Sequence, residues 1–143
     1  MEYKLRKILE KIRTEAPSDT FTGVGVVVCS SIDSIPFLPM SENSQLSNEV
    51  DTVSMIMEGS LATNVNHDGF NILDEDLNLL YRNVFISPPI KNVRDLNIKQ
   101  GTGARYVAAI LASKIEGVAI TGVVSNSYGI VVFKDGKILD TDD

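Results

Sequence analysis

The sequence predicts a single α/β domain with a mixed central β-sheet flanked by helices. Three observations support this fold class. The length of 143 residues fits one domain. Hydrophobic residues make up 43% of the chain, enough for a real core. Continuous apolar runs alternate with segments of helical periodicity, which is typical of helices layered on a buried sheet. We divide the chain into an N-terminal amphipathic helix with its linker, residues 1–20, and an α/β domain, residues 21–143.

The first half of the chain is expected to contain two helices and one buried strand. Residues 3–15 form an amphipathic pattern with one apolar stripe, made of Leu5, Ile8, Leu9 and Ile12. Residues 23–30 are a continuous run rich in valine, which favours a strand buried on both faces. Residues 33–45 carry two prolines and several serines and are expected to form a loop. Residues 46–58 favour a second helix, closed by Gly59.

The second half is expected to add a hairpin, another helix and three more strands. The hairpin joins a short strand that begins near Phe70 to a strand over residues 77–86. A loop over residues 90–100 then leads to a helix. The remaining elements follow in order: a helix over 104–115 and strands over 117–124, 130–134 and 137–139.

Composition excludes several classes of protein. A net charge of −6 and a pI near 4.7 argue against a general nucleic-acid binder, which would need a basic face. The single cysteine, Cys29, excludes an internal disulfide and a cysteine-based zinc site, and its apolar surroundings predict a buried, inert thiol. No apolar stretch approaches the length of a membrane span, and no signal-peptide pattern opens the chain, so we expect a cytoplasmic protein.

One glycine-rich turn stands directly before the third helical pattern. Gly101, Thr102 and Gly103 precede the helix, in which one face is formed by Ala104, Ala108, Leu111 and Ile115. The first backbone N–H groups of such a helix have no helical acceptor, and with the helix dipole they form a site for phosphate. Arg105 lies in this first turn, where a cation opposes the dipole, so a bound anion is a better reason for it than local stability. The alternative is a tight loop with a surface arginine.

A second candidate site is the sequence His67-Asp68-Gly69, where a loop meets a strand. Loops that are positioned by a scaffold carry many functional residues. Asp68 could bind a divalent cation or accept a proton from a hydroxyl group. A lone histidine is more often a surface residue or a satisfied core residue than a ligand. Neither candidate site is specific by itself.

The order of these motifs resembles the diadenylate cyclase domain, which makes cyclic di-AMP from two ATP. That family carries an (H)DGA motif, a strand pair, the motif GTRHRAA at the start of a helix, and then a strand and a turn such as SEETG or SQRRN. The matching segments here are His67-Asp68-Gly69-Phe70, Gly103-Ala104-Arg105-Tyr106-Val107-Ala108-Ala109 and Val123-Val124-Ser125-Asn126-Ser127-Tyr128-Gly129-Ile130. The resemblance runs from the first strand to Leu139.

The resemblance implies a nucleotidyltransferase in which two subunits face each other, each holding one ATP. Asp68 and Arg105 would be catalytic, and His67 and Asp68 would hold Mg²⁺ or Mn²⁺. The ribose 3′-oxygen of one ATP would attack the α-phosphate of the other, so a homo-oligomer is implied. The residues expected to contact the nucleotide are Gly69, Phe70, Gly103, Ala104, Arg105, Tyr106 and Ser125.

Several positions depart from the family motifs. Phe70 replaces the alanine of DGA, and its ring must displace something, for example the base or the ribose. Tyr106 and Val107 replace the second and third residues of the RHR triplet, which the family associates with the phosphates. Asn126 and Ser127 replace two residues that are acidic in many members. A second hypothesis is therefore a degenerate domain of this fold, which binds a nucleotide or serves assembly without turnover. A third is a structural α/β domain that keeps remnants of the motifs.

Overall fold

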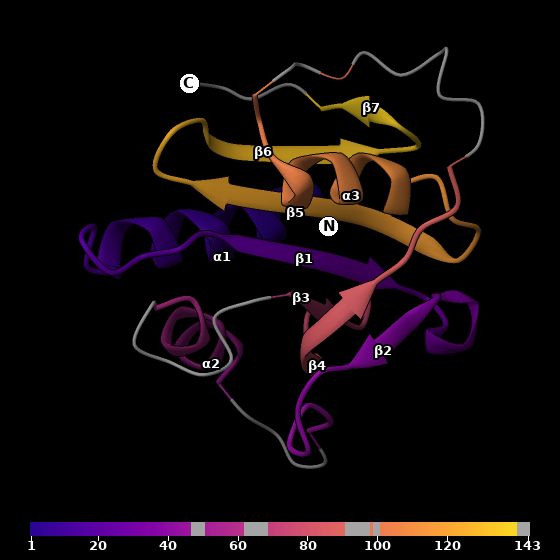
Figure 1. Cartoon of the computed structure of the whole chain (residues 1–143), viewed down its shortest axis with the longest axis horizontal. Coiled ribbons are helices and arrows are strands. Elements are labelled where there is room, and N and C mark those ends of the chain that lie inside the picture. Colours follow the sequence, from indigo (N-terminus) through magenta and orange to yellow (C-terminus); the bar gives the residue numbers. More distant parts are fainter. Residues whose placement is uncertain (47–50, 62–68, 91–97, 99–100, 140–143) are drawn as a thin grey trace.

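Figure 1 shows the computed structural model of the chain, a single domain built on one mixed, seven-stranded sheet. The structure describes residues 1–46, 51–61, 69–90, 98 and 101–139. The strands occur in the spatial order β2 (Phe37–Pro39), β4 (Leu79–Ile86), β3 (Phe70–Leu73), β1 (Val24–Cys29), β5 (Val118–Ser125), β6 (Gly129–Lys134) and β7 (Lys137–Ile138).

Strand β1 lies in the centre of the sheet. Its Val26 pairs with Asn71 of β3 in parallel and with Gly122 of β5 in antiparallel fashion. The other neighbouring pairs of described strands are antiparallel. All six residues of β1 are buried, because helices cover both faces of the sheet at this strand. This confirms the doubly buried strand that the valine-rich run predicts.

Three α-helices of the described chain are divided between the two faces. Helices α1 (Glu2–Glu15) and α2 (Thr52–Gly59) pack on one face, and α3 (Ala104–Ala112) packs on the other. A short 3₁₀ helix, η1 (Ile32–Ser34), follows β1. The first face holds a cluster that we call the α1 cluster, which includes Leu5, Leu9, Ile12, Val26, Ile56 and Val124. The second holds the α3 cluster, which includes Val27, Phe70, Tyr106, Ile110, Val123 and Phe133.

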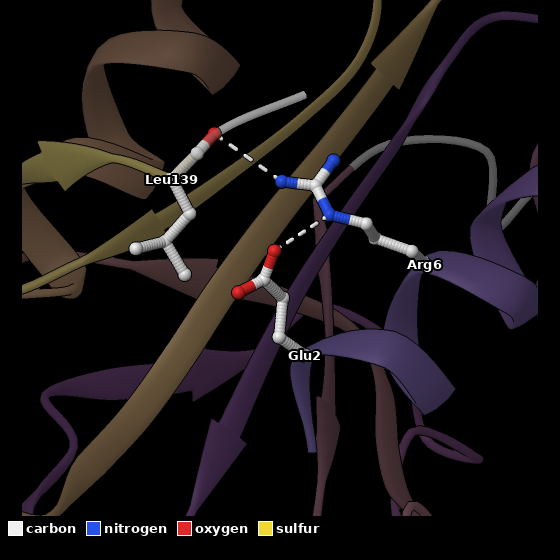
Figure 2. A network of polar contacts seen from close by, with 3 residues as sticks. All are labelled: Glu2, Arg6 and Leu139. Atoms are coloured by element: carbon white, nitrogen blue, oxygen red, sulfur yellow. Dashed lines mark hydrogen bonds and ion pairs between the residues drawn. The ribbon is translucent and has the colours of Figure 1, made fainter. Parts of the chain in front are cut away.

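The N-terminal helix is held to the end of the sheet by a polar network as well as by its apolar stripe (Figure 2). Arg6 Nε donates to Glu2 Oε2 at 2.9 Å, one helical turn earlier, and Arg6 Nη2 donates to the Leu139 carbonyl at 3.2 Å. Leu139 directly follows β7. Helix α1 therefore belongs to the same packed unit as the sheet.

Some predicted elements have different bounds. The loop expected over 33–45 contains the edge strand β2. Pro39 is tolerated in this strand because an edge strand does not need a backbone N–H donor on its outer side. The helix expected over 46–58 begins at Thr52, and residue 46 instead donates its N–H to the Leu80 carbonyl. The helix expected over 104–115 ends at Ala112. The loop expected over 90–100 lies mostly outside the described residues, as do residues 47–50.

Among the described helices, none combines the length and the apolar character that crossing a bilayer requires.

Candidate functional site

A cavity of about 650 Å³ opens beside the N-terminus of α3. Five segments meet around it: the glycine turn with the start of α3, the start of β3 with the neighbouring β4, the segment that leads into β1, the residue after β2, and the turn between β5 and β6. Its volume is within the range of about 300–1,000 Å³ that is typical of small-molecule sites. The residues that line it are Thr22, Met40, Gly69, Phe70, Val84, Phe85, Ile86, Thr102, Gly103, Ala104, Arg105, Ala108, Ser125, Ser127 and Tyr128.

The start of α3 presents backbone donors at this cavity. Gly103 is the N-cap residue, with φ 93°, and Gly101 has φ 83°, so both adopt a conformation that favours glycine. Gly103 has no side chain with which to cap the helix, and among the described residues an added Cβ at Gly103 would meet nothing within 4 Å. The first intrahelical bond runs from Val107 N–H to the Gly103 carbonyl. The N–H groups before it have no acceptor within the helix, which makes this an anion-binding geometry.

Arg105 is anchored at the edge of the cavity. Its Nη1 donates to the Thr22 carbonyl at 3.0 Å, and the side chain is half-buried. Gly23 leaves room for it, because a Cβ there would lie 2.7 Å from Arg105 Nη1. A surface arginine on a tight loop does not describe this side chain. The guanidinium lies over the start of β1 and lines the cavity from there.

Gly69 and Phe70 enter the cavity wall at the start of β3. Gly69 has φ 86° and packs against the Val84 carbonyl of β4. Phe70 is 6% exposed, and its ring lies against Gly25 of β1, where an added Cβ would be 2.7 Å from the ring. The glycine in β1 therefore makes room for a large side chain at the position where the motif has alanine. The ring still contributes to the cavity wall.

The turn after β5 supplies hydroxyl groups. Ser125 Oγ accepts a hydrogen bond from the Ser127 N–H at 2.9 Å, and the two hydroxyl oxygens lie 2.8 Å apart. The neighbouring Asn126 Nδ2 donates to the Ser18 carbonyl, which ties this turn to the segment after α1. Ser125 and Ser127 therefore face the cavity on a turn that is fixed from both sides.

Tyr106, which the resemblance implies as a nucleotide contact, is not a lining residue of the cavity. Its side chain is 2% exposed and packs edge to face on Tyr128 and Phe133, with ring centroids 5.3 and 5.1 Å away. Burial raises the pKa of both tyrosines, and for Tyr128 the Arg105 charge opposes this shift. Tyr106 therefore packs against Tyr128, and Tyr128 lines the cavity.

An apolar groove of about 620 Å³ adjoins the cavity on the other side of the glycine turn. Val107 and Leu111 of α3 line it together with Phe85, Pro88 and Ile90, and it shares the turn itself with the cavity. Ala104 and Ala108 line both spaces. The face of α3 that carries Ala104 and Ala108 therefore looks onto the cavity, and the core is reached instead by Tyr106, Ala109, Ile110 and Ala112.

The expected metal ligands, His67 and Asp68, lie outside the described residues. Asp68 directly precedes Gly69, a lining residue. Within the described ranges, no group of three His, Cys, Asp or Glu side chains could hold a metal ion. Cys29 is buried, and burial raises the pKa of its thiol. The described donors at the cavity are backbone amides, hydroxyls and one guanidinium, which suit phosphate oxygens.

Comparison with known proteins defines the fold. No family model matches the chain, and no curated protein matches it by sequence. Among solved structures, it is similar to DacA from Staphylococcus aureus, crystallised as a double cysteine mutant, with a TM-score of 0.62 and 20% identity over 96% of this chain and 86% of that one. The chain has the fold of DacA.

A hypothetical membrane spanning protein from Bacillus cereus is also similar, with a TM-score of 0.69 and 14% identity. The match covers 94% of this chain and 59% of the Bacillus cereus protein, so this chain spans little more than half of that length. At these identities the likeness shows a shared fold.

Sequence reasoning missed several residues of the cavity wall. Tyr128 follows the serine turn and could have been included as its aromatic neighbour. Thr22 and Met40 carry no local signal, because tertiary folding alone brings them to a helix that begins far along the chain.

Proposed function

We propose that the cavity binds the phosphates of ATP and that the protein is a divergent nucleotidyltransferase of the diadenylate cyclase type. One observation carries the proposal: the start of α3, where the N-cap residue is a glycine, and the anchored Arg105 converge on a cavity of suitable volume. The DacA-like fold supports it. The expected motif residues Gly69, Phe70, Gly103, Ala104, Arg105 and Ser125 all line this one cavity.

In the proposed reaction, the ribose 3′-oxygen of one ATP attacks the α-phosphorus of a second ATP on a facing subunit. A new P–O bond forms, pyrophosphate leaves, and a second such step closes cyclic di-AMP. Gly103, Ala104 and Arg105 would hold the phosphates and the charge of the departing pyrophosphate. Because one site cannot close the ring, a homo-oligomer is part of the proposal, as is a cytoplasmic location.

The proposal assigns a divalent cation, Mg²⁺ or Mn²⁺, to Asp68 and His67. Carboxylate oxygen and phosphate oxygens together form the ligand set that Mg²⁺ prefers. Bound there, the ion would offset phosphate charge and favour ionisation of the 3′-hydroxyl. Asp68 would hold it next to Gly69, at the edge of the described cavity wall.

A second candidate is a domain that binds the nucleotide, or serves assembly, without turnover. The position of two α3 residues favours it. Tyr106 is buried against Phe133, and Val107 lines the apolar groove, so neither side chain supplies the charged phosphate contacts of the family triplet. Fewer charge-assisted bonds would weaken transition-state stabilisation.

Incubation of the pure protein with ATP and Mn²⁺, with products resolved by mass, separates the two candidates. Formation of cyclic di-AMP supports the enzyme. A rise in melting temperature with ATP but no product supports the binding domain. No rise at millimolar ATP would contradict nucleotide binding altogether, since any ligand of the folded state stabilises it by mass action.

Asp68→Asn extends this test to the expected metal ligand. We expect loss of product with an unchanged melting temperature, because an amide replaces a carboxylate poorly as a ligand of a hard cation. Asp76→Asn is the matched control, since Asp76 lies exposed in the turn between β3 and β4. Undiminished product with Asp68→Asn would remove Asp68 from the mechanism.

A further inference from the structure

We infer that Thr22 is a positioning residue, which holds the Arg105 guanidinium in place for the nucleotide phosphates. The inference rests on the proposed function and adds to it a residue outside every motif of the sequence. Thr22 lies two residues before the start of β1 and lines the cavity. Its carbonyl accepts the hydrogen bond from Arg105 Nη1 at 3.0 Å.

Thr22 is itself fixed by two hydrogen bonds to a single acceptor. Its N–H donates to the Ser60 carbonyl at 2.8 Å, and its Oγ1 donates to the same oxygen at 2.6 Å. A residue held through both its backbone and its side chain keeps its own carbonyl in one orientation. The hydroxyl group therefore acts on Arg105 through the Thr22 backbone.

The acceptor is equally well fixed. Ser60 is buried at the C-terminus of α2, where its N–H donates to the Ile56 carbonyl at 3.0 Å and its Oγ donates to the Met57 carbonyl at 2.6 Å. An antiparallel bridge between Phe21, which precedes Thr22, and Leu61, which follows Ser60, joins the same two segments. The chain of contacts thus runs from the end of α2 through Thr22 to the first turn of α3.

This arrangement lowers the cost of binding an anion. An arginine side chain loses considerable rotamer freedom when it is immobilised on a ligand. A guanidinium already held by the Thr22 carbonyl has lost part of that freedom before the nucleotide arrives.

The first test measures ATP affinity by calorimetry on the whole chain. Thr22→Val keeps the shape and removes the hydroxyl donor, and it should raise the Kd for ATP about two- to tenfold, the factor that corresponds to one net hydrogen bond. Thr22→Ser keeps the donor and should restore wild-type affinity.

Thr52→Val is the matched control. Thr52 Oγ1 donates to the Leu77 carbonyl at 3.0 Å and, like Thr22, anchors one end of α2, but it does not line the cavity. It should lower the melting temperature about as much as Thr22→Val and leave ATP affinity unchanged. Equal ATP affinity of Thr22→Val and wild type would overturn the inference, and so would an equal loss in Thr52→Val.

A second measurement needs no nucleotide. In NMR spectra of the guanidinium groups, the Nη signals of Arg105 should be resolved in the wild type and averaged by rotation in Thr22→Val, with Arg105→Lys assigning them. Identical signals in both proteins would overturn the anchoring. If the wild type does not bind ATP, the proposed function fails and the positioning role fails with it; if ATP binds wild type and Thr22→Val equally, only the positioning role fails.

Discussion

Two glycines in neighbouring strands have opposite consequences for the two faces of the sheet. Gly122 of β5 faces α1, and an added Cβ there would lie 2.9 Å from Leu9 Cδ1. Because glycine has no Cβ, the helix can approach the sheet closely at this position. Gly25 of β1 faces the α3 side, where the ring of Phe70 occupies the space. The first glycine allows a helix to pack closely on its face of the sheet, which we call the sealed face. The second makes room for an aromatic ring that lies beside an open cavity.

This difference indicates that the face covered by α1 contributes mainly to stability, whereas the face covered by α3 contains the candidate site. Among the described residues, the α1 cluster contains only apolar side chains that do not ionise. Helix α1 is 14 residues long and packs on β5 and β6. Helix α3 is shorter, with nine residues, and it begins at the glycine turn. The part of the sheet that α3 does not cover borders the cavity. The following variants test this division.

The largest change in stability is expected on the sealed face. Leu9→Ala should lower the free energy of unfolding by about 2–5 kcal/mol, because Leu9 is fully buried and the cavity left behind cannot collapse completely. Urea denaturation would measure it. Leu38→Ala, at a site 66% exposed on β2, is the control and should stay within about 0.5 kcal/mol. A small effect of Leu9→Ala would show that α1 is not part of the core.

Arg105→Ala should abolish the stabilisation by ATP, which for the wild type amounts to about 2.7 kcal/mol at a hundredfold excess over Kd. The empty protein should lose about 1 kcal/mol, since a hydrogen bond from a charged donor to the Thr22 carbonyl outweighs the relief at the helix dipole. Thermal melts with and without ATP measure both effects, with exposed Lys4→Ala as control. A full ATP shift in Arg105→Ala would exclude the arginine from binding.

Gly25→Ala should cost about 1–3 kcal/mol, because the new methyl overlaps the Phe70 ring. The displaced ring should also lower ATP affinity, and Phe70→Leu in the same protein should restore part of both. Gly122→Ala is the matched variant on the sealed face: it should destabilise through Leu9 and leave ATP affinity unaltered. Equal effects of the two variants on ATP binding would contradict the division between the faces.

The smallest effect concerns alkaline pH. Burial raises the pKa of Cys29, Tyr106 and Tyr128, all on the α3 side, above the ordinary values of 9.0 for the thiol and 10.0 for the phenols. The folded state then holds these protons more tightly than the unfolded chain, so stability is unaffected below about pH 9 and falls as the pH rises above it. Melts from pH 7 to 10.5 should show this fall. Tyr106→Phe should make it shallower, and an unchanged slope would refute the assignment.

The parts of the fold that depend on local pattern could be predicted from the sequence. Helix α1, strand β1 and the β3–β4 hairpin follow from apolar periodicity and turn residues, and the structure confirms them. Strand β2 could not be predicted, because its reason to exist is the pairing of Leu38 with Phe85 of β4. Periodicity also placed Ala104 and Ala108 on one helix face without showing that this face meets the cavity.

Some of the residues that line the cavity were named from the sequence, but their tertiary partners were not. The sequence shows the glycine turn as the start of a helix, and it shows Arg105 as a cation in the first turn, where it opposes the helix dipole. The Thr22 carbonyl that holds the arginine belongs to a segment 83 residues away, and the Gly25 that receives Phe70 belongs to another strand. Tyr106 occupies a motif position, yet its aromatic neighbours in the core determine where its ring lies.

The central place of β1 has a kinetic consequence. The strand precedes both of its neighbours in the chain, so Val26 must await Asn71 on one side and Gly122 on the other. Pairings this distant in sequence slow folding, so we expect milliseconds to seconds rather than microseconds. Until β5 arrives, the run Val24–Cys29 exposes an apolar, uncharged edge. Refolding at high protein concentration should therefore favour association through this edge over the native sheet.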